Sequence, residues 1–483
     1  METKGLFGLT GDASSHIFRP TKPKYGEVPM AYNFLPYEQR QNFLLPPSII
    51  DWVRPESLEC FVSELIEQLE AKGRLVPFYE NYRDDGWGRA AYHPRMMVKV
   101  LVYAYCRGIT SSRKIAQALE SEVPFRFLSA NQQPDFRTVS DFRKDHLAKL
   151  QGLFVDVLRI CQGAGLAKMG RVALDGRKVA GNAALDQNRN KEALEAEAKR
   201  LLEEAERVDA EEDKKYGKDK RGDELPEELR DPRSRIQRIA EACARLEEAE
   251  RREKEKQKKK VEKRKQEERK TGKKRRGRRP KDPKEVVNRD KKANITDPDS
   301  RILKTRRGWA QGYNAQAVAD CESQVIVAAD VTQEENDVKQ LGPMLDRCEE
   351  QAGQRPEQLL ADAGYWSEDN AGLEDERTEM FIATTKDWKQ RKAQREQGVP
   401  REPIPEDATL KERMERKLLT ERGKAAYKQR GATIEPVFGQ MVMRNLVRFW
   451  LRGIGKVKGE WSLWCTSHNI LKLWRSGVEL NPG

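Results

Sequence analysis

Two short apolar runs of the sequence each end in an aspartate that a glycine follows within two residues. Residues 172–174 lead to Asp175, and residues 359–361 lead to Asp362. A buried strand presents a carboxylate in this way at the carboxyl edge of a sheet, where open α/β folds keep their sites. A third acidic residue, Glu435, falls on a predicted helix. Two strand-end aspartates and a helix-borne glutamate predict a three-carboxylate site for divalent metal.

Such a site has a defined chemistry. Magnesium prefers carboxylate oxygens and keeps several waters, so three acidic residues suffice as ligands. Two ions about 3.5–4 Å apart can activate the attacking oxygen and stabilise the leaving oxygen of a phosphodiester in an in-line displacement. One carboxylate must bridge both ions, and we expect Asp175 to do so. The rival carboxylate is Asp330, at the end of the predicted strand 325–329, whereas Asp320 is expected in a turn.

The bulk composition fits a partner that is a polyanion. Lys and Arg number 92 against 79 Asp and Glu, a formal charge of +13 over 483 residues. This balance favours nucleic acid or an acidic surface. The seven cysteines form no CxxC pair, which argues against a disulfide framework or a zinc site and suits a reducing cytosol. No signal-peptide core and no run of about 18 apolar residues is present, so no membrane span is expected.

The remaining periodicity predicts the elements that would position the carboxylates. After the strand that ends at Asp175 and a long insertion come a hairpin, a helix, the strand that ends at Asp362, a helix and a last strand. Their expected ranges are 313–319 with 325–331, 336–350, 359–361, 367 onwards and 379–384. With the insertion removed, this is the order of an RNase H-like core. We therefore predict an α/β fold, a mixed sheet flanked by helices.

The first third of the chain reads as helical. Helices are expected over 58–69, with one apolar face, and from Pro94 onwards, followed by short helices near residues 112–119 and 142–150. Thr138 and Ser140 are the expected caps of the last one. Arg137 and Arg143 lie close by, which suits a helix-turn-helix DNA reader. An ordinary helical bundle with a basic surface fits equally well.

The insertion has its own pattern. Apolar residues step by three and four within 190–208 and again within 233–250, which predicts an antiparallel helical hairpin or coiled coil. Beyond Ala249 this seam fades into a run that ends in Lys-Lys-Arg-Arg-Gly-Arg-Arg-Pro at 273–280. Such runs are usually solvated or disordered arms. This one could also bind DNA phosphates or a narrow minor groove through Arg276, Arg278 and Arg279.

Taken together and in order, these motifs resemble the bacterial insertion-sequence transposases of the DDE type, the cut-and-paste class with an RNase H-like catalytic domain. The resemblance spans most of the chain and covers the charged hairpin only loosely. The motifs that carry it are Leu174-Asp175-Gly176, residues 312–316, residues 361–365, Tyr427-Lys428-Gln429-Arg430 leading to Glu435-Pro436-Val437-Phe438-Gly439, and residues 43–47.

The resemblance implies roles for individual residues. Asp175, Asp362 and Glu435 would hold two Mg²⁺ ions, for which Mn²⁺ could substitute. Tyr427 and Arg430 would contact phosphate near the transposon end. Trp388 would stack on a flipped base, a contact worth about 1–3 kcal/mol, or else serve as a buried anchor. We expect the four carboxy-terminal tryptophans to lie in the core, and His146 and His468 to have structural roles.

Two departures from the family signature stand in the sequence. Four residues separate Arg430 from Glu435 where the signature has three, and Val442 stands where the signature has a lysine. Arg444 or Lys456 could replace that lysine.

The predicted layout is an extended arm over 1–45, a helical DNA-binding domain over 46–168, and a catalytic domain made of 169–185 and 301–475. The charged hairpin and basic arm over 186–300 are inserted after the first strand. The expected function is cleavage and strand transfer on double-stranded DNA, at terminal inverted repeats and target, by a homodimer in the bacterial cytoplasm at the nucleoid. The alternatives are a nuclease of the same fold that cuts without joining, and a catalytically silent DNA-binding protein.

Overall fold

The structure is a computed structural model. It describes residues 48–80, 82, 90–216, 232–272, 277, 279–280, 282–283, 291–305, 308–399, 404–405 and 407–480. The expected arm over 1–45 lies outside these described residues, as do Arg276 and Arg278.

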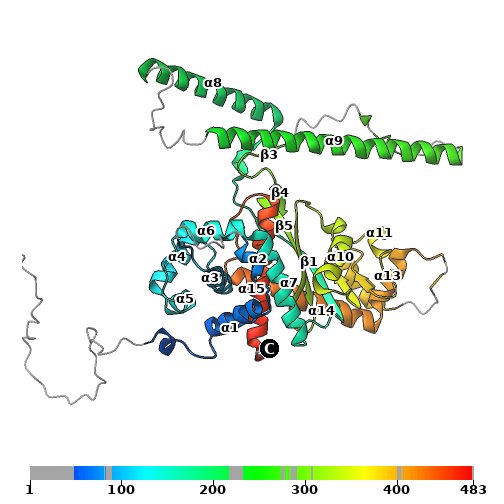
Figure 1. Cartoon of the computed structure of the whole chain (residues 1–483). Helices are drawn as coiled ribbons and strands as arrows, with labels where there is room; N and C mark the ends of the chain where they lie inside the picture. The colour runs from blue at the N-terminus through cyan, green and yellow to red at the C-terminus, as the bar shows by residue number, and fades with distance from the viewer. Residues whose placement is uncertain are drawn as a thin grey trace, which may run out of the picture. The chain divides into compact units, whose positions relative to one another are not determined.

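A six-stranded mixed sheet forms the centre of the fold (Figure 1). Its strands are β1 (Arg171–Ala180), β4 (Arg301–Thr305), β5 (Gly308–Asp320), β6 (Ile326–Thr332), β7 (Gln358–Ala361) and β8 (Glu379–Ile382). β5 is antiparallel to β1, β4 and β6, while β1, β7 and β8 run parallel to one another. β7 ends at Ala361, just before Asp362, whereas β1 continues past Asp175 to Ala180, so the expectation that the first strand ends at Asp175 was wrong. The two aspartates nevertheless stand at adjacent positions, because Leu174 pairs with Ala361. The mixed α/β class predicted from the sequence is confirmed.

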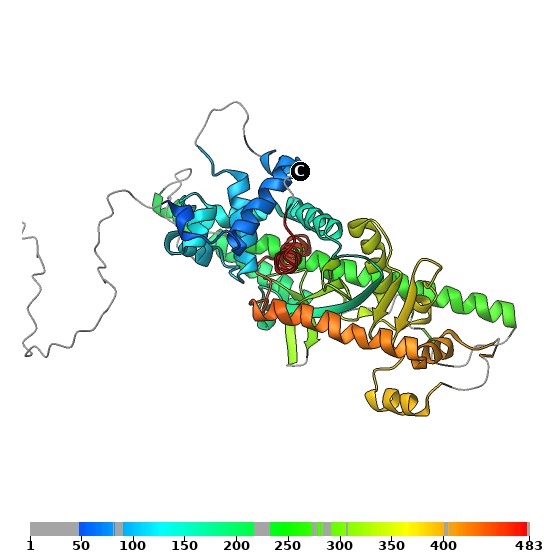
Figure 2. The ribbon, with the colours of Figure 1, turned by 90° about the horizontal axis from the view of Figure 1, so that it is seen from below.

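Helices flank this sheet. α10 (Leu341–Ala352) and α15 (Ile454–Arg475) pack against β6, and α14 (Glu421–Met443) packs against β1, β5 and β7. Figure 2 shows α14, in orange, running along the sheet. Trp461 and Trp464 of α15 are fully buried, as expected, but Trp450 is 42% exposed, so the expectation that all four carboxy-terminal tryptophans are core was wrong for that residue.

The amino-terminal helices share one hydrophobic core with the sheet. They are α1 (Leu58–Ala71), α2 (Val76–Tyr79), α3 (Pro94–Cys106), α4 (Ser112–Ser121), α5 (Val123–Leu128), α6 (Phe136–Asp145) and α7 (Leu147–Gly163). α3 and α7 both pack against α15. The expectation that Thr138 and Ser140 cap a helix was wrong. Helix α6 begins earlier, at Phe136. Its cap is Asp135, whose carboxylate accepts a hydrogen bond from the Thr138 backbone N–H over 2.7 Å.

The insertion contains the predicted helical hairpin, made of α8 (Lys191–Tyr216) and α9 (Pro232–Thr271). It also contains a two-stranded ribbon of β2 (Asn188–Arg189) and β3 (Ala293–Asn294). Lys191 Nζ lies 2.7 Å from Glu247 Oε1, and a small core of its own joins the helices to the ribbon. α9 continues well beyond Ala249, where the apolar seam fades. Lys, Arg, Gln and Glu favour helix, and pairs one turn apart such as Lys254 with Glu250 add to it.

Two shorter elements follow β6 and β7 along the chain. Ser367 caps α11 (Glu368–Ala371) by accepting a hydrogen bond from the Asn370 N–H over 3.0 Å. The predicted helix 336–350 is divided into a 3₁₀ turn, η4 (Asp337–Lys339), and α10. The seven cysteines are all free thiols. None of the described helices is both long and apolar enough to span a membrane.

Candidate active site

Asp175 and Asp362 lie side by side. In the parallel pairing of β1 with β7, Leu174 is opposite Ala361, so the next residue on each strand is an aspartate. Burial raises the pKa of Asp175 to about 6, and the negative charges of Asp362 and Asp337 add to the effect, while Arg430 opposes it. The raised pKa reflects burial first and the neighbouring negative charges second.

α14 brings the third predicted carboxylate to the same place. Arg430 Nη1 lies 3.3 Å from Asp175 Oδ2, and Nη2 lies 3.5 Å from Glu435 Oε1. One guanidinium therefore joins Asp175 to Glu435, even though the two residues are far apart along the chain. Glu435 is 67% exposed at its side chain, whereas Arg430 is only 14% exposed. Tyr427, one turn earlier on α14, has its ring 5.9 Å from the Arg430 guanidinium carbon.

The donor set suits a hard divalent cation, because all of these candidate ligands are carboxylate oxygens. Among the described residues, no three His, Cys, Asp or Glu side chains lie close enough together to hold a metal ion in this arrangement. The Arg430 guanidinium lies between two of the predicted ligands and supplies the positive charge there.

A carboxylate that the sequence reading overlooked, Asp337, also lies at this site. It stands on η4, directly after β6, and its Oδ1 accepts hydrogen bonds from Asn314 Nδ2 over 2.6 Å and from Gln316 Nε2 over 2.9 Å. The signal was an acidic residue between the end of a strand and the start of a helix. That is the same kind of position that pointed to Asp362.

The alternatives weighed from the sequence lie elsewhere. Asp330, the rival carboxylate, pairs with Lys458 over 2.7 Å and with Arg347 over 3.5 Å, so its charge is already balanced. Asp320 accepts hydrogen bonds from the backbone of the turn that follows it, as expected. Arg444 donates to Ser467 Oγ over 3.4 Å and lies over the ring of Trp464, which places it in the packing around α15.

Of the two predicted DNA contacts on α6, one is buried and the other is exposed. Arg143 is buried and donates to the Thr110 carbonyl over 2.8 Å and to the Tyr105 hydroxyl over 3.2 Å. Its expected role in DNA binding is therefore corrected, because a guanidinium engaged inside the fold does not reach DNA. Arg137 is exposed, with its guanidinium carbon 5.7 Å from the ring centre of Phe136.

Three further predicted residues can be placed in the structure. Trp388 begins α12 (Trp388–Gln397), but its side chain is outside what the structure describes, and Arg279 is exposed. His146 and His468 are buried and bound to backbone carbonyls, which fits the structural roles expected of them.

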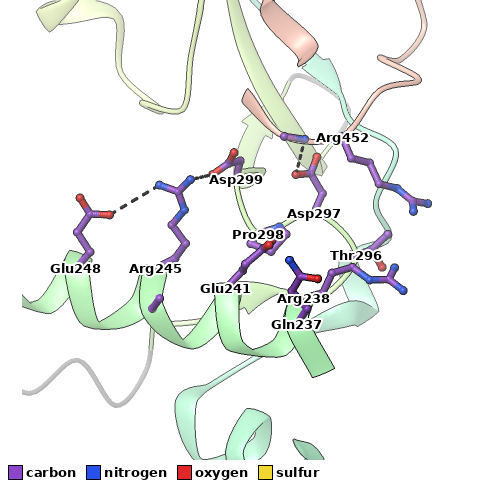
Figure 3. Close-up of a pocket in the computed structure, with 12 residues that line it drawn as sticks. Gln237, Arg238, Glu241, Arg245, Glu248, Thr296, Asp297, Pro298, Asp299 and Arg452 are labelled. Atoms are coloured by element: carbon purple, nitrogen blue, oxygen red, sulfur yellow. Dashed lines mark hydrogen bonds and ion pairs between the residues drawn. The ribbon is translucent and has the colours of Figure 1, made fainter. Parts of the chain in front are cut away.

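A pocket of about 760 Å³ lies at the base of the insertion, between α9, residues 296–299 and residues 452–453 (Figure 3). Arg245 of α9 pairs with Asp299 over 2.5 Å, and Asp299 in turn accepts a hydrogen bond from the Ile454 N–H over 2.9 Å at the start of α15. The pocket wall thus ties the hairpin to the same helix that packs against β6.

Comparison with known families agrees with this geometry. Residues 47–145 match the family described as Transposase domain (DUF772), and residues 389–474 match the family described as Transposase DDE domain. No curated protein and no solved structure matches the chain. The two matches support a transposase. More narrowly, they support an insertion-sequence transposase of the DDE type. The second match contains Tyr427, Arg430 and Glu435.

Proposed function

We propose that this transposase binds the ends of its element and catalyses metal-dependent strand cleavage and strand transfer on DNA. The observation that carries the proposal is the meeting of Asp175, on β1, with Asp362, next to it after β7, and with Glu435, which Arg430 joins to Asp175. The carboxylates come from separate parts of the chain and lie in one region, although among the described residues no three of them are close enough to hold a metal ion in this arrangement.

The proposal assigns the sheet to the RNase H-like class. The supporting feature is the order of strands, in which β1 lies between the antiparallel β5 and the parallel β7, with β6 on the far side of β5 and β8 beyond β7. Asp175 stands within β1 and Asp362 directly follows β7, at adjacent positions of the two central strands. Open α/β sheets bind ligands near the carboxyl ends of such strands.

Asp175, Asp362 and Glu435 would hold two Mg²⁺ ions, or Mn²⁺ in their place. When bound, such ions supply charge stabilisation to the attacking and leaving oxygens of the phosphodiester. Arg430 has a separate role in the proposal. Its planar fork of donors fits a phosphate as well as a carboxylate, so with the carboxylates neutralised it is free to contact the DNA backbone beside Tyr427.

Double-stranded DNA is the proposed partner, as terminal inverted repeats and as target. The net charge of +13 supports a polyanionic partner. The exposed Arg137 and Arg279 are proposed DNA contacts, together with Arg276, Arg278 and Trp388. Pairing of two ends further suggests a homodimer at the bacterial nucleoid.

The test is a strand-transfer assay on DNA that carries the inverted repeats from either side of the coding region. We expect joined products from the wild type, and we expect Asp362→Asn to abolish cleavage while end binding stays within a few fold. Cleavage without joining would show the alternative nuclease, and binding without either step would show a silent DNA-binding protein. Retained cleavage by Asp362→Asn would refute the site.

A further inference from the structure

The carboxylate of Asp337 lies beside the glycines that follow Asp175 and Asp362. A Cβ added to Gly176 would lie 2.7 Å from Asp337 Oδ1, and a Cβ added to Gly364 would lie 3.6 Å from Asp337 Oδ2. The same position beside Gly364 is 2.8 Å from Asp362 Oδ1. Asp337 and Asp362 therefore border one small space, which a side chain at residue 364 would fill.

The two oxygens of Asp337 have different surroundings. Oδ1 is held by the side-chain amides of Asn314 and Gln316, which both extend from β5. Gln316 is held in turn by the Tyr365 hydroxyl, which donates to its Oε1. Among the described residues, no hydrogen bond reaches Oδ2, the oxygen near Asp362. The carboxylate is thus fixed at one oxygen and free at the other.

A buried acceptor beside Asp337 supplies an independent indication of a ligand. Asn314 is fully buried, with 0% of its surface exposed, and its Oδ1 has no hydrogen-bond partner among the described residues. This oxygen lies 2.9 Å from the Cβ position at Gly176, next to Asp337 Oδ1. A buried acceptor left without a donor costs about 1–3 kcal/mol. A hydrated divalent cation carries water molecules that could supply that donor.

We propose that Asp337 is a fourth carboxylate of the cation site, with Oδ2 directed to the cation on the Asp362 side and Oδ1 held by Asn314 and Gln316. This inference rests on the proposed function. It accounts for why two amides of β5 converge on one oxygen of a carboxylate and leave the other open. It also accounts for the glycines at 176 and 364, whose missing side chains leave room for Asp337 to reach the site.

The test is Mn²⁺ binding to the full chain without DNA, measured by the electron paramagnetic resonance signal of free Mn²⁺. The variants are Asp337→Asn, Asp362→Asn and the control Asp330→Asn. Asp330 has a side chain only 24% exposed but is paired with Lys458 and Arg347. The Asn variant at 337 keeps an acceptor for the two amides and loses only the charge. We expect its Mn²⁺ dissociation constant to rise about tenfold or more, with no change in the control.

The outcomes separate this inference from the proposed function. Wild-type affinity in Asp337→Asn, with weakened affinity in Asp362→Asn, would overturn the role of Asp337 and leave the cation site standing. If the wild type binds no Mn²⁺, or Asp362→Asn binds as well as the wild type, both proposals fall. Should Asp337→Asn fail to fold, Asp337→Ser provides the same reading, because its hydroxyl still accepts from one amide.

Discussion

Arg430 Nη1 lies 3.3 Å from Oδ2 of Asp175. The second arm of the same guanidinium pairs with Glu435, so a cation of the protein itself offsets the repulsion among the acidic residues. Under the proposed function, the protein must stay folded before its metal and its substrate arrive. Arg430 can serve that purpose because its fixed fork binds two carboxylates at once.

Replacing Arg430 with Gln tests this role. We expect the metal-free variant to lose about 1–3 kcal/mol of stability, since Asp175 would lose its cationic partner at a site where burial and neighbouring carboxylates already oppose its charge. Added Mg²⁺ should then raise the melting temperature of the variant by more than that of the wild type. The measurement is the melting temperature with and without Mg²⁺. Lys428→Gln, which removes an exposed cation from the same helix, is the matched control. An equal Mg²⁺ response in all three proteins would contradict the prediction.

Two glycines on α14 make a matched pair for testing how that helix is positioned. A Cβ on Gly423 would lie 2.0 Å from the Lys417 carbonyl oxygen at the end of α13 (Leu410–Leu419), whereas a Cβ on Gly439 would meet nothing within 4 Å. We expect Gly423→Ala to cost about 1–3 kcal/mol, because the obstacle is backbone and cannot rotate away.

The same substitution should also reduce cleavage, since a shift of α14 moves Arg430 and Glu435 away from Asp175. Gly439→Ala should be neutral or stabilise by about 0.5–1 kcal/mol through helix propensity. Thermal melting and end cleavage of both variants check this. A Gly423→Ala protein as stable and active as Gly439→Ala would show that α14 is free to adjust.

The buried imidazole of His468 predicts a pH dependence of stability. Its Nε2 donates to the Gln324 carbonyl over 2.9 Å, and its Nδ1 faces the Arg444 guanidinium at 3.5 Å. Burial, together with the nearby cations Arg444, Lys472 and Arg475, lowers the pKa of His468 to about 3. The unfolded chain therefore binds a proton that the folded chain does not, and stability falls as the pH falls from the unfolded pKa towards the folded one.

That difference amounts to on the order of 2 kcal/mol between about pH 7 and pH 5. His468→Gln removes the titrating group, so we expect it to lose less stability than the wild type over this interval, even if its stability at neutral pH is lower. Melting temperatures of the two proteins at both pH values give the comparison. Parallel losses would contradict the assignment of the buried neutral imidazole.

Much of the site could be predicted because its signals are local. A short apolar run before Asp175, and another before Asp362, define buried strands whatever the rest of the chain does. Helical spacing likewise placed Tyr427 and Arg430 on one helix. The apolar residues spaced by three and four in the insertion predicted its hairpin. The apolar runs at 313–319 and 325–331 predicted strands β5 and β6.

The errors and omissions concern burial and contact between distant segments. Arg143 reads as a surface cation, but the fold closes around it, because Tyr105 and Thr110 come from other elements. Asp337 reads as the polar start of a helix, and only the amides of β5 direct it towards Asp362.

By itself, therefore, the sequence determined most of the elements, the position of Asp362 directly after its strand and the resemblance to the family. The tertiary structure decided which charges meet, that Arg430 lies between Asp175 and Glu435, and that Asp337 joins them. The physical reason is that strand and helix patterns depend on neighbouring residues, whereas the pairing of charges depends on how separate elements pack.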